Sequence, residues 1–499
     1  MRIGKAKIPA FIVLSVVFTV LVIIGVKVIY MENGTMNIVI DTEKKYQTFS
    51  GFGTSSCWWS QNISDEKTRD EIAKLLFSEE GLGLKIFRYN VGGGVNPEHN
   101  RVTEPWRNTE SFYYFDDKAG EWKYDFTRDK NAQDFLFKSL SYGCIDTVVL
   151  FANSPHYSMT VTGEASGGAE KGVTNIAPDM YAPFADYFLD ITEYFISKGV
   201  PVKYISPINE PQWDWGGDDV NQEGCHYEPE EALKVFEVFA KKIQERGLDV
   251  KLSLPDSGEI GESTMEYFTK AAENEVTFRN TGSFAYHSYW SDFNPAAKKK
   301  FGSWYREQSF SDIPLDMTEW CELPNKHDTM SAEGAALMAR IVANDLSLTG
   351  VNSWTAWVGV NRKWIQEDGL DYTDAMITAN DDFSEWSITM RYYAMAHFSK
   401  FIPKGSAAVD AQSRIMPFRI SNKKILYKTN FCAFLTPDGK TVLVISNEDK
   451  EKTVSLTAEG ENMEVYTTDD LHKLEKTFSG GMQSELLLPE NSITTVVID

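Results

Sequence analysis

Residues 184–210, FADYFLDITEYFISKGVPVKYISPINE, contain the helix-to-strand unit that decides the fold. The apolar side chains of its first half recur at helical spacing, and the helix they predict stops at Gly199. The apolar segment 202–209 then has the length of a buried strand. Strands that alternate with helices are typical of βαβ units and a parallel sheet. The helix face consists of Phe184, Phe188, Ile191 and Phe195.

The same alternation extends from residue 47 to residue 399, which we predict to be the catalytic domain. A second helix begins at Pro229 and ends at Gly247, in the pattern expected of helix ends. Eight strand–helix repeats fit a closed barrel better than an open sheet, so we predict an α/β fold, a (β/α)8 TIM barrel. The eight predicted strands are 47–56, 84–91, 147–154, 202–209, 250–255, 284–289, 315–320 and 351–358.

The pattern changes to short strands without helices from residue 400 to residue 499. Two of these strands flank the turn sequence Pro437-Asp438-Gly439. About 100 residues of this kind predict a C-terminal side β-sandwich. The short strand 36–41 has no helix partner, and we expect it to join the sandwich.

The N-terminal residues 1–30 are predicted to be a signal anchor or a signal peptide. Basic residues precede an uncharged apolar run, 8–26, that is longer than a usual signal-peptide core and close to the length of a spanning helix. The basic flank assigns this end to the cytoplasmic side. We therefore expect an extracellular enzyme, either membrane-anchored through 8–26 or secreted after cleavage.

The composition limits the classes of partner. The net charge is −23, which disfavours binding to nucleic acid. The five cysteines are widely spaced, no CxxC pair is present, and the seven histidines are scattered, so we predict no metal site and no cofactor. Aromatic residues make up 13% of the chain, which suits sugar-binding platforms and a large aromatic core equally well. We expect a monomer.

Two glutamates stand at the ends of predicted strands. Glu210 follows the strand 202–209, and Glu319 lies at the end of the strand 315–320. The carboxyl ends of barrel strands meet at one mouth, where the working residues lie. A carboxylate pair suits cleavage of a glycosidic bond, with about 5–5.5 Å between the carboxyl groups for retention of configuration and about 6.5–9.5 Å for inversion. The sequence leaves that separation open.

Other polar and aromatic residues are predicted near the same mouth. Arg88 lies in the second strand, where an inward guanidinium needs a carboxylate partner and would lower the pKa of a nucleophile, although a surface ion pair is the alternative. His287 and Tyr289 share a face of the sixth strand, where His287 could instead be a core residue. Trp357 and Trp213 are candidates for contact with a sugar.

Taken together, these residues resemble family 30 of the glycoside hydrolases over roughly residues 36–499. The resemblance implies a (β/α)8 barrel with a side β-sandwich and a retaining, double-displacement mechanism without metal. It also implies that Glu210 is the acid/base and Glu319 the nucleophile. The motifs that carry it are 47–55, 88–94, Asn153-Ser154-Pro155, Asn209-Glu210-Pro211, His287-Ser288-Tyr289, Thr318-Glu319, 354–357 and 397–402.

The resemblance implies further contacts with the substrate. Asn209 would hold the 2-hydroxyl of the sugar, and Arg88 and Tyr289 would support the nucleophile. Trp357 would stack beneath the sugar at the cleavage point, with His287 and Tyr157 nearby.

Within the family, the segments 51–59 and 89–94 look most like those of endo-β-1,6-galactanases. Val95 and His156 depart from residues that related enzymes carry, which bears on the choice of sugar. We therefore expect a plant-type polysaccharide or oligosaccharide as substrate. The alternatives are a xylanase, a β-1,6-glucanase or a β-glucosidase-type member, and, from a different class, an inactive carbohydrate-binding surface protein.

Overall fold

The computed structural model describes residues 36–218, 220–323, 327–365, 369–421 and 424–499. The apolar run 8–26 and the predicted signal segment 1–30 lie outside these residues. Among the residues described, no helix is both long and apolar enough to span a membrane.

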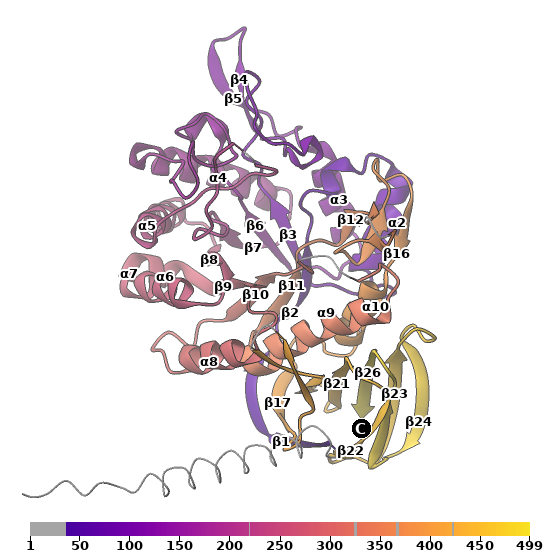
Figure 1. The fold of residues 1–499 in the computed structure, drawn as a ribbon. Helices are drawn as coiled ribbons and strands as arrows, with labels where there is room; N and C mark the ends of the chain where they lie inside the picture. The colour runs from indigo at the N-terminus through magenta and orange to yellow at the C-terminus, as the bar shows by residue number, and fades with distance from the viewer. Residues whose placement is uncertain (1–35, 219, 324–326, 366–368, 422–423) are drawn as a thin grey trace, which may run out of the picture.

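Eight parallel strands close into a barrel, which confirms the predicted fold class (Figure 1). Each strand pairs with its neighbours in chain order, and the last strand pairs with the first. The strands in chain order are β2 (Gly51–Ser55), β3 (Ile86–Asn90), β6 (Thr147–Phe151), β7 (Val202–Ser206), β8 (Lys251–Glu259), β9 (Thr281–Tyr289), β10 (Leu315–Glu319) and β11 (Ser353–Ala356).

Amphipathic helices cover the outside of the barrel. The sequence determines where they start and stop: α5 begins with a capping box between Glu228 and Glu231 and ends at Gly247, whose φ of 64° is left-handed. Their apolar faces pack against the strands and form one continuous core. The helices are α2 (Glu66–Phe77), α3 (Lys130–Leu140), α4 (Tyr181–Ser197), α5 (Pro229–Arg246), α6 (Glu262–Glu273), α7 (Glu275–Asn280), α8 (Pro295–Arg306), α9 (Ala332–Asn344) and α10 (Met390–Ser399).

Short sheets are inserted into the loops that follow the barrel strands. The hairpin β4 (Tyr113–Asp116) and β5 (Glu121–Tyr124) lies between β3 and α3 and projects from the body of the molecule (Figure 1). After β11 come a three-stranded sheet and a two-stranded sheet. They consist of β12 (Val360–Arg362), β15 (Ile377–Ala379) and β16 (Trp386–Ile388), and of β13 (Trp364–Ile365) and β14 (Asp371–Tyr372).

A nine-stranded sheet forms the second layer of the molecule, below the barrel in Figure 1. Side chains from strands near both of its edges, including Met463 and Leu488, share one hydrophobic cluster, so the sheet folds over on itself as a sandwich. In spatial order the strands are β24 (Glu475–Gly481), β23 (Asn462–Thr468), β26 (Ser492–Ile498), β21 (Thr441–Asn447), β20 (Thr429–Leu435), β17 (Ala407–Gln412), β1 (Asn37–Thr48), β22 (Lys452–Thr457) and β25 (Glu485–Leu488).

The strand β1 pairs antiparallel with β17 and parallel with β22, far from its neighbours in sequence. Its alternate residues Ile38 and Ile40 point into the core of the sandwich. A separate hairpin of β18 (Phe418–Ser421) and β19 (Lys424–Tyr427) precedes β20.

The strand β21 links the two hydrophobic cores. Its side chains alternate between the two faces of the sheet. Val442 and Val444 belong to the core of the barrel, whereas Leu443 and Ile445 belong to the core of the sandwich. The barrel and the sheet therefore pack through a continuous apolar contact.

His397 of α10 makes one of the polar contacts between the two layers. The side chain is fully buried, with Nδ1 2.7 Å from the Thr495 hydroxyl and Nε2 2.8 Å from the Thr468 hydroxyl. Burial lowers the pKa of His397 to about 3, so the imidazole is neutral in the folded protein at neutral pH.

This pKa makes the stability depend on pH. An unfolded histidine takes up a proton below about pH 6.5, whereas folded His397 does not, so its contribution is present above that pH and is lost as the pH falls. Between pH 7 and pH 5 the loss should be about 2 kcal/mol. Denaturant unfolding of the wild type and of His397→Gln should show a smaller decrease in the variant, which cannot titrate. His156 is also buried and neutral, and it contributes the same pH-dependent loss in both proteins. An equal decrease in the wild type and the variant would therefore show that His397 contributes nothing and would contradict the assignment.

Candidate active site

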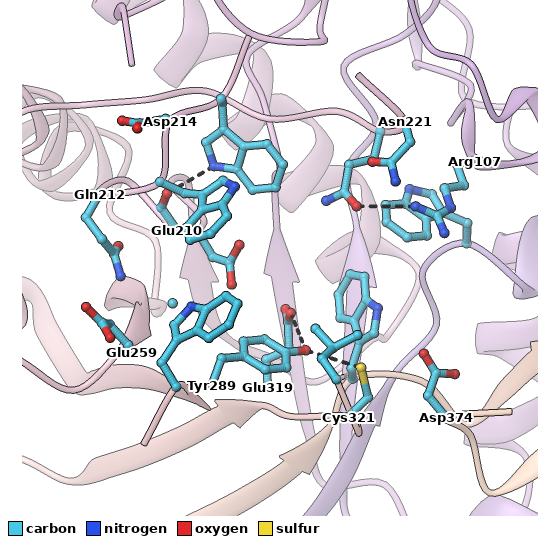
Figure 2. A pocket seen from close by; sticks show the side chains of 18 of the residues that line it. Arg107, Glu210, Gln212, Asp214, Asn221, Glu259, Tyr289, Glu319, Cys321 and Asp374 are labelled. Atoms are coloured by element: carbon cyan, nitrogen blue, oxygen red, sulfur yellow. Dashed lines mark hydrogen bonds between the residues drawn. The ribbon is translucent and has the colours of Figure 1, made fainter. Parts of the chain in front are cut away.

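The carboxyl ends of the barrel strands surround a cavity of about 570 Å³. Carboxylates, amides and aromatic rings line it together (Figure 2), a combination typical of sites that bind sugars or other polar ligands by orientation as well as by apolar contact. Glu210 and Glu319 both face this space, from the loop after β7 and from the end of β10.

The two carboxylates are close together. An oxygen of Glu210, an oxygen of Glu319 and a ring nitrogen of His287 all lie within 4.8 Å of one another. The closest oxygens of the two carboxyl groups are therefore nearer than the roughly 6.5–9.5 Å that leaves room for a water between them, which favours the retaining separation of about 5–5.5 Å. The Glu210 side chain is 15% exposed and that of Glu319 only 6%, so Glu210 is the more accessible of the two.

Arg88 of β3 is fully buried beneath the cavity and binds several acceptors. Its Nη1 donates to Oε2 of Glu319 at 2.8 Å, and its Nη2 donates to Oδ1 of Asn209 at 2.7 Å and to Oδ2 of Asp256 at 3.3 Å. The guanidinium carbon also lies 3.6 Å from the centroid of the Phe151 ring. Arg88 thus pairs with a carboxylate of the site, as its place in the sequence suggested.

His287 of β9 lies between three carboxylates. Its Nδ1 is 2.9 Å from Oε1 of Glu210 and 3.7 Å from Oε1 of Glu319, and its Nε2 is 3.8 Å from Oδ1 of Asp256. Burial opposes a charge on the imidazole, but the carboxylates outweigh it and raise the pKa of His287 to about 9. The ring is therefore protonated at neutral pH and compensates part of the surrounding negative charge.

The pKa values of the buried carboxyl groups move in opposite directions. Burial raises the pKa of Glu319, the nearby Glu210 carboxylate adds to the rise, and His287 and Arg88 oppose it. Burial also acts on Asp256, but there Arg88 and His287 prevail and hold its pKa well below the usual value. Asp256 therefore stays ionised as the permanent counter-ion of this cluster.

Tyr289 donates its hydroxyl to Oε1 of Glu319 at 3.1 Å. Since Arg88 binds the other oxygen of the same carboxylate, Glu319 is fixed from two sides. A fixed carboxylate loses little freedom when it reacts, which is how enzymes lower the entropic part of a barrier.

Two residues of the site have a left-handed backbone conformation. Glu210 and Asp256 have left-handed φ values of 47° and 56°, uncommon for residues other than glycine. The Glu210 amide donates to the Asp256 carbonyl at 2.8 Å, and the Glu210 carbonyl accepts from Nε1 of Trp215 at 3.0 Å. Strain of this kind is maintained by surrounding contacts and is concentrated at functional sites.

The predicted site residues fall into three groups. The first group lines the cavity, the second lies directly behind it, and the third consists of Tyr157 alone, which lies elsewhere. The ring of Tyr157 lies 4.4 Å from that of His156 and 5.8 Å from that of Trp122, at the base of the β4–β5 hairpin. The cavity is lined by Glu210, Trp213, Tyr289, Glu319 and Trp357, and the residues behind it are Arg88, Asn209 and His287.

The two positions that depart from the family are also outside the lining. His156 is fully buried, with its Nε2 3.1 Å from the Tyr113 carbonyl oxygen, and burial lowers its pKa to about 3. Val95 is 41% exposed. His156 therefore stabilises the base of the hairpin.

Several residues of the site were not predicted. Asp256, which binds Arg88 behind the cavity, directly follows the predicted strand 250–255 just as Glu210 directly follows 202–209, so the rule that selected Glu210 applies to it as well. Trp58 and Trp290 come from loops and Arg107 from the three-residue 3-10 helix Pro105–Arg107, where periodicity carries no signal. The guanidinium of Arg107 stacks on the rings of Trp58 and Trp106, with its carbon 4.9 and 5.2 Å from their centroids.

Glu210, His287 and Glu319 are also the types of side chain that bind divalent metals. A metal-binding histidine must be neutral and must present a free lone pair. With a pKa of about 9, His287 carries a proton on each ring nitrogen at neutral pH and pairs with the surrounding carboxylates as a cation.

Two family models match the chain. The model described as O-Glycosyl hydrolase family 30 matches residues 35–300, and the model described as Glycosyl hydrolase family 30 beta sandwich domain matches residues 418–496. The first alone covers more than half of the 499 residues.

Individual proteins agree with these matches. The chain is 23% identical to an endo-beta-1,6-galactanase of Hypocrea rufa, over 74% of this chain and 75% of that protein. It is 25% identical to putative glucosylceramidase 1 of Caenorhabditis elegans, over 83% and 76% of the two chains. The crystal structure of a conserved exported protein from Bacteroides fragilis has the same fold, with a TM-score of 0.77, 24% identity and coverage of 92% and 100%. The chain belongs to family 30 of the O-glycosyl hydrolases.

Proposed function

We propose that this enzyme is an endo-β-1,6-galactanase that works by a retaining mechanism, with Glu210 as acid/base and Glu319 as nucleophile. The observation that carries the mechanism is the separation of the two carboxylates, whose closest oxygens lie within 4.8 Å.

In the first step, the carboxylate of Glu319 attacks the anomeric carbon while the carboxyl group of Glu210 protonates the leaving oxygen. Glu319 is held by Arg88 at 2.8 Å and by Tyr289 at 3.1 Å, so attack requires little rearrangement. When Glu319 becomes an ester it loses its charge, and Arg88 keeps Asp256 as its partner at 3.3 Å. The buried cation is therefore neutralised throughout the cycle.

In the second step, the carboxylate of Glu210 takes a proton from water, which attacks the same carbon and releases Glu319. Protonated His287 at 2.9 Å from Glu210 stabilises this residue whenever it is ionised. Asn209 is the proposed partner of the 2-hydroxyl. Its oxygen accepts from Arg88, which leaves the amide nitrogen to contact the sugar.

The substrate is supported by the likeness to the galactanase of Hypocrea rufa and by the segments 51–59 and 89–94. Trp357 and Trp58 enclose one side of the cavity, with ring centroids 5.2 Å apart and an angle of 84° between the ring planes. Trp357 is the proposed platform for the sugar at the cleavage point.

A glucoside is the second candidate, favoured by the likeness to a putative glucosylceramidase. An inactive binding protein is disfavoured, because both carboxylates and their partners are present.

The nucleophile can be tested by replacing it. Glu319→Gly should reduce turnover by at least about 10⁴-fold, because the covalent step is lost. Azide should restore activity and yield a glycosyl azide of inverted configuration. In Glu210→Ala, azide should instead give a product of retained configuration, since Glu319 still reacts first. Near-normal turnover of Glu319→Gly would show that the nucleophile is another residue.

The sugar can be identified by product analysis. Purified enzyme incubated with β-1,6-galactan should release oligosaccharides of several lengths, as an endo-acting enzyme does. Glucuronoxylan, β-1,6-glucan and a β-glucoside serve as comparisons, and Glu319→Gln as the inactive control. Clear cleavage of one of these together with intact galactan would refute the proposed specificity and leave the mechanism standing.

We also propose that the enzyme acts outside the cytoplasm, on the basis of the basic residues and the apolar run 8–26. In cells of the source organism, activity should be accessible to added polymeric substrate. Cell fractionation, with a variant lacking residues 1–30 as the control, distinguishes a membrane-bound from a released form. Activity confined to the cytosolic fraction of the full-length protein would contradict the proposal.

A further inference from the structure

The cavity has an aromatic wall that the chemistry at Glu210 and Glu319 does not use. Trp213 and Trp290 stack with ring centroids 5.7 Å apart and an angle of 10° between the ring planes. Parallel rings at this distance are offset, so the pair leaves ring faces uncovered. Both rings line the cavity, and the two residues are 46% and 56% exposed. Exposed tryptophans beside a binding cavity indicate contact with a ligand.

The backbone holds both residues in place. Trp290 has a left-handed φ of 59°, which a bulky residue rarely adopts. The Trp213 amide donates to the Glu210 carbonyl at 3.1 Å, and the Trp213 carbonyl lies 3.0 Å from Nδ1 of His226. The two rings are therefore pre-positioned, which reduces the entropic cost of binding a ligand.

The position of the pair indicates which part of a substrate it would meet. Gln212 and Asp214, which flank Trp213 in the sequence, lie on the same side of the cavity as Glu210, and Arg107 and Asn221 lie on the opposite side (Figure 2). Glu210 protonates the leaving oxygen in the proposed mechanism. The leaving part of the substrate therefore lies on the side of Trp213.

We propose that Trp213 and Trp290 form a subsite for the sugar unit on the leaving-group side of the cleaved bond. This inference rests on the proposed role of Glu210. A pyranose would stack its C–H face on the open ring surface, and a galactose unit suits this well because its axial 4-hydroxyl leaves the hydrogens of C3, C4 and C5 on one face. A sugar bound on each side of the cleaved bond permits cutting within a chain.

The same subsite has a second use. After the first step it can bind a saccharide instead of water. A hydroxyl of that saccharide attacks the anomeric carbon, its proton passes to the carboxylate of Glu210, and the bond between that carbon and Glu319 breaks. The product is a longer saccharide, so the pair also promotes transglycosylation.

The test compares two leaving groups in Trp213→Ala and Trp290→Ala. The first substrate is the oligosaccharide that the wild type cleaves best. The second is the corresponding glycosyl fluoride, whose leaving group is too small to reach the pair. For the oligosaccharide, kcat/KM should fall about 10- to 100-fold. For the fluoride it should stay within about twofold of the wild type. The fraction of transglycosylation products should fall as well.

Trp364→Ala is the matched control. This tryptophan is 36% exposed and stacks on Tyr372, with ring centroids 6.0 Å apart, but it does not line the cavity. The control should leave both substrates unaffected.

Three outcomes would overturn the subsite. Equal losses on both substrates would mean that the tryptophans only support the catalytic residues. Unchanged activity would mean that no sugar contacts them. A loss confined to glycosides with an aryl or lipid leaving group would assign the pair to an apolar, non-sugar group. A wild type inert toward every saccharide and fluoride would instead contradict the proposed function, so the two failures are distinguishable.

Discussion

The buried charge of Arg88 is the constraint around which the rest of the site is arranged. A guanidinium without access to water requires paired acceptors, since an unpaired buried charge costs several kcal/mol. Those acceptors are Glu319, Asn209 and Asp256, which come from different parts of the barrel. One cation therefore fixes the relative positions of β3, β8, β10 and the end of β7. A closed barrel suits this purpose, because its parallel strands end around one mouth.

The site separates chemistry from recognition. The charged cluster of Arg88, Asp256, His287 and Glu319 lies in or directly at the barrel strands and is almost fully buried. The walls that would meet a sugar come from loops of varied length, among them the segments that hold Arg107 and Trp290. Loops tolerate changes that strands do not. The two relatives named above, an endo-beta-1,6-galactanase and a putative glucosylceramidase, differ in the substrate that their names give.

The sequence predicted the fold class well, because barrel strands and their helices leave clear periodic signals. Glu210 and Glu319 were found because each follows an apolar strand, and both line the cavity. Their catalytic roles stay a prediction. Asp256 also directly follows a predicted strand, 250–255, but was not singled out; in the structure it lies inside β8, which extends to Glu259. Trp290 and Arg107 were missed for a different reason. Their positions depend on how loops pack in three dimensions, and a single sequence carries no local signal for that.

Tyr157 is the one residue taken from the family resemblance that lies apart from the cavity lining and from the residues directly behind it. Its ring packs on His156 and Trp122. The prediction for segment 8–26 concerns residues outside those that the structure describes.

The pairing of β1 has a consequence for the order in which the chain can fold. During synthesis β1 emerges before any barrel strand, but its neighbours β17 and β22 emerge after the whole barrel. Until then Ile38 and Ile40 have no sandwich core to enter. An unpaired strand of this kind offers free backbone groups to other chains, so β1 is exposed to wrong pairing until the C-terminal strands have been made.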